Sequence, residues 1–314
     1  MTRMSGAELS SSQTGWRDGV SSATRLNMVV GIPTSGRPAI LRATLAHLAC
    51  QTRTPDRLLV CATSPADVEG ATSIGSHIDV LYAMPGLPRQ RNTIIAAADR
   101  ADVLVFFDDD FLPDPRYLAV VEHHLRCCPD TVIATGRVLA DGIKGPGLSV
   151  ADAMAILARS GGATHGVHPI FSAYGCNMAV RLEPMRRQGV QFDERLPLYG
   201  WQEDVDLSRR LASFGKVVRL DAATGVHLGV KLGRGSGVRL GYSQVANPLY
   251  LASKRRGYPF GRAVVQILKN MVNNITRVPW PESYIDRRGR ILGNVLALRD
   301  LARGRMRPER ALDL

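Results

Sequence analysis

Short apolar runs and helical patterns alternate along the first third of the chain. Four runs have the length and composition of strands, at residues 27–32, 58–62, 78–82 and 103–107. Helical spacing lies between them, at 39–50 and 92–98. The last run is apolar throughout, which predicts a strand buried on both faces. The alternation predicts an α/β fold with a mainly parallel, Rossmann-like sheet and flanking helices.

The pattern is less regular after residue 115. We expect strands at 176–181 and 216–220, a helix at 203–214 that Gly215 caps, and loops at 161–162 and 165–169. The chain is therefore divided into a disordered lead-in (1–26), a main domain (27–230, with halves 27–115 and 116–230) and a helical extension (231–314). Ligands bind beyond the carboxyl ends of parallel strands, so the loops that follow the first four strands are the places to search for a site.

The positive charge of the chain is concentrated in the extension. Residues 231–314 hold 17 Lys and Arg against 5 Asp and Glu, which accounts for the whole formal charge of +12. Within them, 261–275 and 287–310 have the pattern of amphipathic basic helices. These helices either lie on an anionic membrane surface or pack their apolar faces on the main domain. Nucleic-acid binding is disfavoured, because aromatic residues are sparse there and residues 1–230 are neutral overall.

Cysteine usage and the first residues favour the cytoplasm. The five cysteines are odd in number and lack metal-ligand spacing, which is typical of reduced thiols. Residues 1–26 contain no apolar stretch of a secretory signal, and no run reaches the roughly 18 apolar residues of a membrane span. We expect a cytoplasmic protein, which is peripheral on the inner face of the cell membrane if the extension binds lipid.

Three adjacent carboxylates, Asp108, Asp109 and Asp110, follow the buried strand directly. They repel one another unless a cation or hydrogen-bond donors lie among them. Carboxylate oxygens suit Mg²⁺ or Mn²⁺, and Mg²⁺ usually shares its site with substrate phosphates. The alternative is a solvated acidic turn, but few such turns follow five consecutive apolar residues. We therefore predict a divalent cation, Mn²⁺ or Mg²⁺, at this strand end.

A second acidic pair, Glu203 and Asp204, begins a predicted helix just after Trp201. A helix N-terminus stabilises negative charge, and a carboxylate there could act as a general base. The aromatic residue could form a platform for a sugar. Simple N-terminal capping explains the pair equally well.

Other polar residues gain meaning only from their place beside strands and helices. Thr34 and Arg37 follow the first strand, where a base or a phosphate could bind. Arg89 and Arg91 precede a helix N-terminus, which suits a diphosphate, although a solvated basic loop is the simpler reading. His227 follows the strand at 216–220, and a lone histidine is more often structural than a metal ligand.

Taken together and in this order, the motifs resemble the family-2 inverting glycosyltransferases of the GT-A (nucleotide-diphospho-sugar transferase) fold. The resemblance covers roughly residues 27–230. It rests on the strand and turn at 31–38, the Arg-Gln-Arg-Asn element at 89–92, the Phe-Phe-Asp-Asp-Asp segment at 106–110, and the acceptor-side segments at 177–181, 192–196 and 203–207. By this resemblance the 27–115 half would bind the nucleotide sugar and the 116–230 half the acceptor.

The resemblance also implies a role for single residues. Asp204 would be the catalytic base, Glu203 and Trp201 would bind the acceptor, and Asp110 and His227 would bind the metal. The nucleotide-sugar donor would be bound by Pro33, Thr34, Arg37, Arg89, Arg91, Asn92, Asp108 and Asp109. The family often has an acidic pair after its second strand to hold the nucleobase, and this chain has Val60-Cys61-Ala62 there. Either Asp67 takes that role or the base is held differently.

The implied activity is metal-dependent, hexosyltransferase-type glycosyl transfer. Asp204 would deprotonate a glycan hydroxyl as that hydroxyl displaces the nucleoside diphosphate, and a single displacement inverts the anomeric carbon. With the basic extension, the resemblance implies a lipid-linked acceptor in bacterial exopolysaccharide or cell-surface polysaccharide synthesis. Two alternatives remain. A nucleotidyltransferase of similar fold should have a Gly-rich basic loop, which 33–36 matches poorly; a non-catalytic glycan-assembly protein should have lost one acidic group.

Overall fold

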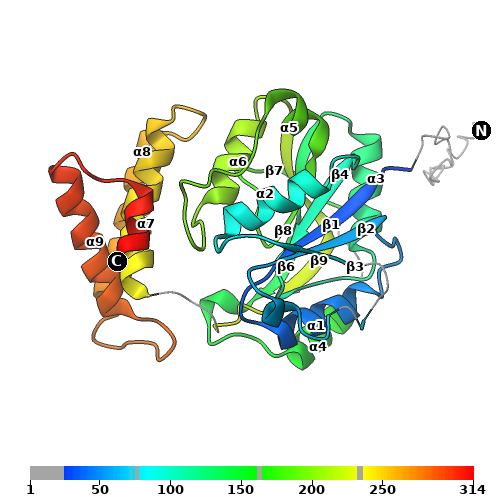
Figure 1. The fold of residues 1–314 in the computed structure, drawn as a ribbon, viewed down its shortest axis with the longest axis horizontal. Helices are drawn as coiled ribbons and strands as arrows, with labels where there is room; N and C mark the ends of the chain where they lie inside the picture. Colours follow the sequence, from blue (N-terminus) through cyan, green and yellow to red (C-terminus); the bar gives the residue numbers. More distant parts are fainter. Residues whose placement is uncertain (1–24, 72, 75–77, 161–164, 232–235) are drawn as a thin grey trace, which may run out of the picture.

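The computed structural model describes residues 25–71, 73–74, 78–160, 165–231 and 236–314. It forms one mixed sheet with helices on both faces and a separate group of helices at the C-terminal end (Figure 1). Nearly all of the predicted lead-in at 1–26 lies outside the described residues, as do 161–162.

The sheet has nine strands, and its N-terminal half is parallel as predicted. In order along the path, the strands are β3 (Ile78–Tyr82), β2 (Arg57–Ala62), β1 (Met28–Pro33), β4 (Val103–Phe107), β8 (Asn177–Arg181), β6 (Thr131–Asp141), β9 (Lys216–His227) and β5 (Phe111–Pro113), with β7 (Val167–Pro169) paired to β9. Strands β1 to β4 are mutually parallel, whereas β8 runs antiparallel between β4 and β6. This reversal places the start of β8 beside the carboxyl end of β4.

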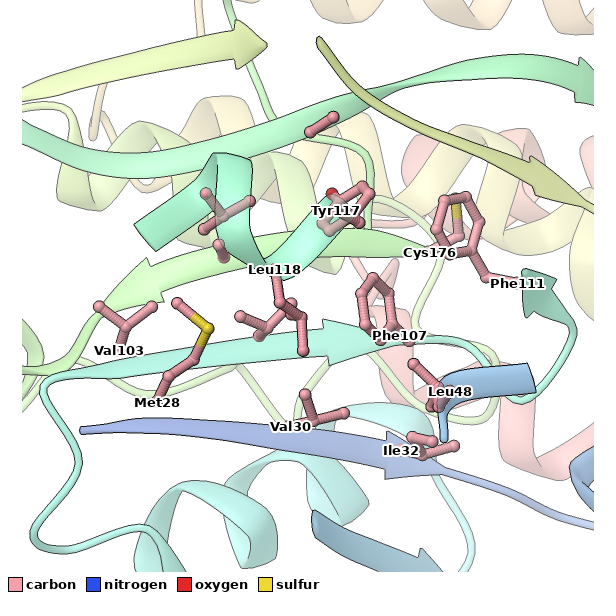
Figure 2. Close-up of a cluster of buried hydrophobic side chains, with 14 of the residues drawn as sticks. Met28, Val30, Ile32, Leu48, Val103, Phe107, Phe111, Tyr117, Leu118 and Cys176 are labelled. Carbon is pink, nitrogen blue, oxygen red and sulfur yellow. The ribbon is translucent and has the colours of Figure 1, made fainter. Parts of the chain in front are cut away.

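Helices cover the two faces of the sheet. One face carries α1 (Pro38–Leu48) and α3 (Tyr117–Cys127); the other carries α2 (Leu87–Ala97), α5 (Leu182–Gln188) and α6 (Glu203–Leu211). Helix α4 (Val150–Arg159) packs near the end of β9. Alternate residues of β1 and β4 point to opposite faces of the sheet, so that Val30 and Val105 join the hydrophobic core under α1 and α3, and Leu104 joins the core under α2, α5 and α6. Figure 2 shows the first of these cores, with Val30 of β1, Phe107 of β4 and Leu118 of α3.

Close approach of α2 to β1 depends on a glycine. A Cβ atom at Gly31 would lie 2.5 Å from Cγ2 of Ile94. Any larger residue at this position would push α2 away from the sheet, and α2 carries Arg91 and Asn92 toward the carboxyl edge.

Several predicted boundaries differ from the structure. The segment 165–169, expected as loop, contains β7, because Val167 to Pro169 pairs with β9. Strand β9 continues seven residues beyond the predicted end and includes His227 as its last residue. Helix α6 ends at Leu211 and not at 214, so Gly215 is not its cap. Strand β6 and helix α3 had no prediction of their own. The five cysteines are unpaired, as predicted.

The C-terminal extension consists of α7 (Gly237–Ser253), α8 (Phe260–Thr276), α9 (Arg287–Ala302) and a final 3₁₀ segment (Pro308–Asp313). Helix α7 packs against both α8 and α9 around Tyr242, Val245 and Ala246. Among the helices that the structure describes, none combines the length and the hydropathy of a membrane span.

The extension is attached to the main domain through α7 and the turn after it. Leu251 and Tyr258 join Leu196 in one small apolar cluster. Lys254 pairs with Asp193 at 2.8 Å and also with Asp206 of α6. One apolar side of the extension therefore packs on the main domain, as the second interpretation of its amphipathic pattern predicted. The outer sides of α8 and α9 do not pack on it.

Candidate functional site

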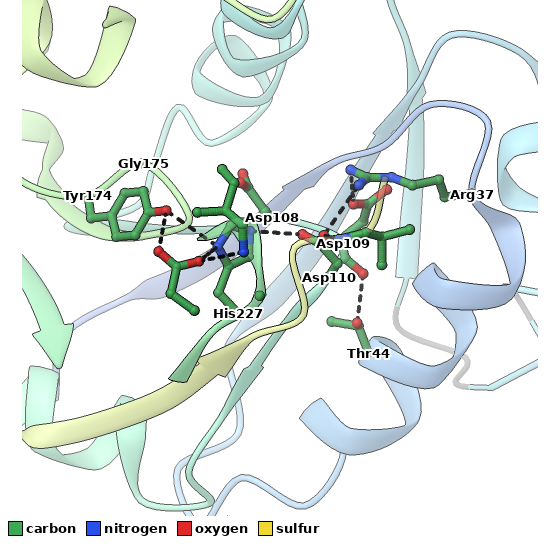
Figure 3. Close-up of polar contacts among 12 residues, drawn as sticks. Arg37, Thr44, Asp108, Asp109, Asp110, Tyr174, Gly175 and His227 are labelled. Carbon is green, nitrogen blue, oxygen red and sulfur yellow. Dashed lines mark hydrogen bonds and ion pairs between the residues drawn. The ribbon is translucent and has the colours of Figure 1, made fainter. Parts of the chain in front are cut away.

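The predicted acidic and basic residues meet at the carboxyl edge of β1 and β4. The three aspartates after β4 have three different environments, which Figure 3 shows side by side. The side chain of Asp108 is 17% exposed, whereas those of Asp109 and Asp110 are almost completely buried. Burial of adjacent carboxylates requires compensating donors or a cation.

Asp109 is engaged by the turn that follows β1. Its Oδ2 accepts a hydrogen bond of 2.7 Å from the hydroxyl of Thr34, and Arg37 forms an ion pair with Oδ1. Thr44 of α1 donates to the backbone oxygen of Asp109 at 2.7 Å. Burial raises the pKa of Asp109 to about 7, against the opposing effect of Arg37. These contacts show Asp109 fixing the β1 turn, with its carboxylate turned away from open solvent.

Asp110 faces His227 at the end of β9. The distance from Asp110 Oδ1 to His227 Nε2 is 3.4 Å, and the backbone N–H of Val230 donates to Asp110 Oδ2 at 2.9 Å. Burial alone would raise the pKa of Asp110, but the bond and charge of His227 lower it. Burial alone would lower the pKa of His227, and its bonds to Asp110 and Asp141 raise it instead to about 10. A proton on His227 thus offsets negative charge that a cation could offset in its place.

Asp108, Asp110 and His227 form a possible metal-binding group. One ligand atom from each lies within 4.8 Å of the others. Two carboxylates and one imidazole are a donor set that suits a first-row divalent ion such as Mn²⁺. The resemblance implied Asp110 and His227 as ligands, and the structure places Asp108 within reach of the same ion.

Asp141 and Tyr174 support His227 from behind, and neither was predicted from the sequence. His227 Nδ1 lies 2.9 Å from Asp141 Oδ1, and the hydroxyl of Tyr174 donates to Asp141 Oδ2 at 3.1 Å. A carboxylate that accepts the Nδ1 proton of a histidine directs Nε2 toward a metal. Asp141 ends β6, a strand that the sequence did not predict, and it lies 86 residues from His227, so no local pattern could identify it.

Arg91 connects the cation-binding side of the site to the start of α6. It is 1% exposed, and its guanidinium pairs with Asp108 at 3.0 Å and with Glu203. It also donates to the backbone oxygen of Gly175 at 2.8 Å, and its guanidinium carbon lies 5.4 and 5.3 Å from the ring centroids of Phe106 and Phe192, which contact each other edge to face. Arg91 therefore holds the two acidic groups together and has no exposed face for a diphosphate.

The first two residues of α6 differ in access. Glu203 is 4% exposed; its Oε1 pairs with Arg91, and its Oε2 has no hydrogen-bond partner among the described residues. Burial raises the pKa of Glu203 to about 8 despite Arg91. Asp204 is partly exposed and accepts hydrogen bonds of 2.9 and 2.8 Å from the N–H groups of Gly175 and Val205. Burial also raises the pKa of Asp204, against the opposing effects of the Gly175 N–H and of the charge of Arg91.

The loop before α6 is held in a strained conformation. Leu198 and Gln202 have φ values of 59° and 72°, which non-glycine residues rarely adopt. The N–H of Leu87 donates to the oxygen of Leu198 at 2.8 Å, and Asn247 of α7 donates to the oxygen of Trp201 at 2.8 Å. The extension thus helps to fix the loop that carries Trp201.

The other residues predicted to bind the nucleotide sugar lie at the same edge of the sheet and differ in their exposure to solvent. Pro33 and Thr34 are buried at the end of β1, and Asn92 bonds both ways with the backbone of Phe192. Arg89 is exposed and pairs loosely with Glu194 at 3.5 Å.

Asp67, the candidate for a nucleobase contact, is buried among backbone donors of its own region. Its carboxylate accepts from the N–H groups of Gly36, Thr63 and Ser64 at 2.7 to 3.0 Å and from the hydroxyl of Thr63. With these donors satisfied, Asp67 joins the turn after β1 to the loop after β2 and is not available to accept a bond from a base.

Neither a protein-family model nor any curated protein matches the sequence. Solved structures do. A mannosyltransferase from Pyrobaculum calidifontis, in complex with GDP-Man and Mn²⁺, has a TM-score of 0.54 at 14% identity, covering 96% of this chain and 82% of that one. Residues 1–349 of S. aureus TarS have a TM-score of 0.51 at 11% identity, covering 89% and 92%. GalNAc-T7 with UDP, GalNAc and Mn²⁺ has a TM-score of 0.52 at 12% identity; the match covers 82% of this chain but only 58% of GalNAc-T7. At these identities the likeness establishes the fold, which is the predicted GT-A fold.

Proposed function

We propose that this chain, which has the GT-A fold, is a metal-dependent inverting glycosyltransferase that moves a sugar from a nucleotide-diphospho-sugar to a glycan hydroxyl. The observation that supports this most directly is Arg91, which joins Asp108 to Glu203 and so brings the cation-binding group and Asp204 into one site. An enzyme of this class needs its cation and its catalytic base close enough for one sugar residue to lie between them.

Asp108, Asp110 and His227 would hold the cation. When bound, the ion would neutralise the charge that develops on the departing diphosphate. Pro33, Thr34 and Arg37 would line the nucleotide side, because they follow β1 at the same edge. The exposed Arg89 is better placed than the buried Arg91 to reach a phosphate, and Asp109 would act by fixing the turn of Thr34 and Arg37.

Asp204 would be the base. Of the two acidic residues that begin α6, it is the more exposed and carries no ion pair with Arg91. Glu203 would position Arg91, and its unbonded Oε2 would be reached by an acceptor hydroxyl only after the strained loop shifts, since that atom is buried. Trp201, with the 55% exposed Tyr199, would provide the surface on which an acceptor sugar stacks.

The acceptor would be a lipid-linked intermediate of bacterial exopolysaccharide or cell-surface polysaccharide synthesis, elongated at the cytoplasmic face of the membrane. This finer assignment is supported by the basic extension, which contacts the loop before α6 through a hydrogen bond from Asn247 to the backbone oxygen of Trp201. A free oligosaccharide acceptor that is used as well as a lipid-linked one would argue against it.

A thermal-shift screen of nucleotide sugars tests the activity class and names the donor. A matching nucleotide sugar with Mn²⁺, at about 100 times its Kd, stabilises the folded state by about 2.7 kcal/mol, which corresponds to a Tm increase of roughly 5 °C. We expect this increase to disappear when EDTA replaces Mn²⁺. Stabilisation by nucleoside triphosphates and by no nucleotide sugar would instead indicate a nucleotidyltransferase.

Asp141→Asn should weaken Mn²⁺ binding without unfolding the protein. An asparagine can no longer accept the Nδ1 proton as a carboxylate does, so Nε2 of His227 becomes a poorer ligand, and we expect the Kd for Mn²⁺ to rise about 10- to 100-fold. Titration of free Mn²⁺ by electron paramagnetic resonance measures this directly. Tyr174→Phe is the matched control, since it keeps the Asp141 carboxylate and removes only a hydroxyl whose contact with His227 Nδ1 is longer, at 3.4 Å, and its effect should be several-fold smaller. Equal Kd values for wild-type protein and Asp141→Asn would remove Asp141 from this role.

A further inference from the structure

Helix α8 carries an apolar stripe that no described part of the chain covers. Val265, Leu268, Val272 and Ile275 are each 50–57% exposed. Their spacing of three and four residues aligns them along one side of the helix. Ala263, Ile267 and Asn274 lie on another side and are buried against the rest of the extension. The stripe is therefore additional to the packing that holds the helix in place.

Exposed aromatic residues precede and follow the stripe along the chain. Phe260 begins α8 and is 66% exposed, and Trp280, in the segment between α8 and α9, is 80% exposed. Exposure of a tryptophan to this degree is costly in water, whereas an aromatic ring at each end of an amphipathic helix is typical of segments that lie in a membrane interface.

The charge around the stripe indicates what covers it. No acidic residue occurs from position 222 to 281. The exposed side chains of Arg255 and Arg256 precede the helix, and Lys269 is exposed on its polar side. A second copy of this chain would bring an equally basic surface to the contact, and the two would repel each other. An anionic lipid surface offers both the apolar layer and the opposite charge.

We propose that α8 lies in the interface of an anionic membrane, with its stripe of Val265, Leu268, Val272 and Ile275 in the acyl region and Phe260 and Trp280 at the level of the headgroups. The membrane contact itself does not depend on the proposed function. Its role does, because that role is to bring a lipid-linked acceptor to Trp201. The turn between α7 and α8 provides the connection, because Tyr258 lies within 3.4 Å of Gln202.

Vesicle flotation of the full chain tests this proposal. The protein should float with vesicles of phosphatidylcholine containing phosphatidylglycerol, and much less with phosphatidylcholine alone. A variant with Val265→Ser, Leu268→Ser, Val272→Ser and Ile275→Ser should lose at least about tenfold in partition coefficient, since each change removes apolar surface from the bilayer. The matched control, Met154→Ser with Phe214→Ser, removes exposed apolar side chains from the main domain and should float as wild type does.

Three outcomes would overturn the proposal: flotation of the α8 variant equal to that of wild type, failure of the wild-type chain to float, or a wild-type dimer in light scattering that the variant converts to monomers. Stabilisation by nucleotide sugar and Mn²⁺, measured without vesicles, separates this test from the proposed function. We expect that stabilisation to be equal in wild type and variant, because α8 does not contribute to the cation group.

Discussion

Asp204→Asn should reduce the rate of sugar transfer by roughly 10²- to 10⁴-fold while leaving donor binding nearly intact. General base catalysis contributes about this factor, and it acts in the transition state and not in the bound ground state. The substitution is nearly isosteric. One amide oxygen remains to accept from Gly175 or Val205, so the structural loss is about one hydrogen bond, or about 1 kcal/mol. Transfer is measured by release of nucleoside diphosphate with saturating acceptor, and donor affinity by calorimetry.

Glu203→Gln is the matched comparison at the neighbouring position. It replaces one of the two carboxylates that pair with buried Arg91, and because Asp108 remains as a partner the cost is that of one hydrogen bond to a charged group, about 1.5–3 kcal/mol. We therefore expect Glu203→Gln to lower the free energy of unfolding clearly, whereas Asp204→Asn lowers it little. A stable Asp204→Asn protein that retains more than a tenth of the wild-type rate would reassign the base.

Sequence patterns predicted the strands that a continuous apolar run defines. Strands β1, β2, β3 and β4 were found within a residue or two. For β1 and β4 the reason is burial on both faces, which leaves no polar position inside the strand. Strand β3 lies at the edge of the sheet and was found despite the exposed Asp79, because the residues around it are apolar. Strand β6 was not found: it is buried along its first half and only partly buried along its second, as it extends toward the site. Its pairing with β9 contains three register shifts, and such irregularity is set by tertiary contacts.

The candidate site was predicted in its residue types but not in its connections. Sequence placed Asp108, Asp110 and Asp204 near strand or helix ends, where ligands bind. Arg91 was assigned to the donor by the resemblance and by its expected place before a helix beginning at residue 92; helix α2 begins instead at Leu87 and includes Arg91. In the structure Arg91 is buried against the rings of Phe106 and Phe192, and the antiparallel insertion of β8 brings Gly175 against it. That arrangement depends on strand order, which local sequence does not encode.

The three adjacent aspartates provide the sharpest test of this difference between pattern and structure. Asp110→Asn should raise the Kd for Mn²⁺ more than about 100-fold, because it removes the charge of a residue that would bind the ion directly. This effect exceeds the one expected for Asp141→Asn, since Asp141 would act only through His227. The amide oxygen can still accept from the N–H of Val230, so the protein should remain folded. The Tm increase that a nucleotide sugar gives in the presence of Mn²⁺ should be lost together with Mn²⁺ binding.

Asp109→Asn is the same chemical change one residue away, and it should have the opposite effects on the Tm and on the Kd for Mn²⁺. Asp109 is outside the cation group, and its carboxylate bonds to Thr34 and Arg37. Loss of its charge leaves Arg37 with a weaker partner, so we expect a lower Tm and a Kd for Mn²⁺ within a few-fold of wild type. The Tm of each variant is measured with EDTA, and the Kd by Mn²⁺ titration. If Asp109→Asn weakened Mn²⁺ binding as strongly as Asp110→Asn, the acidic cluster would bind the cation as an undifferentiated group, and the distinct roles that burial and hydrogen bonding give to these neighbours would be wrong.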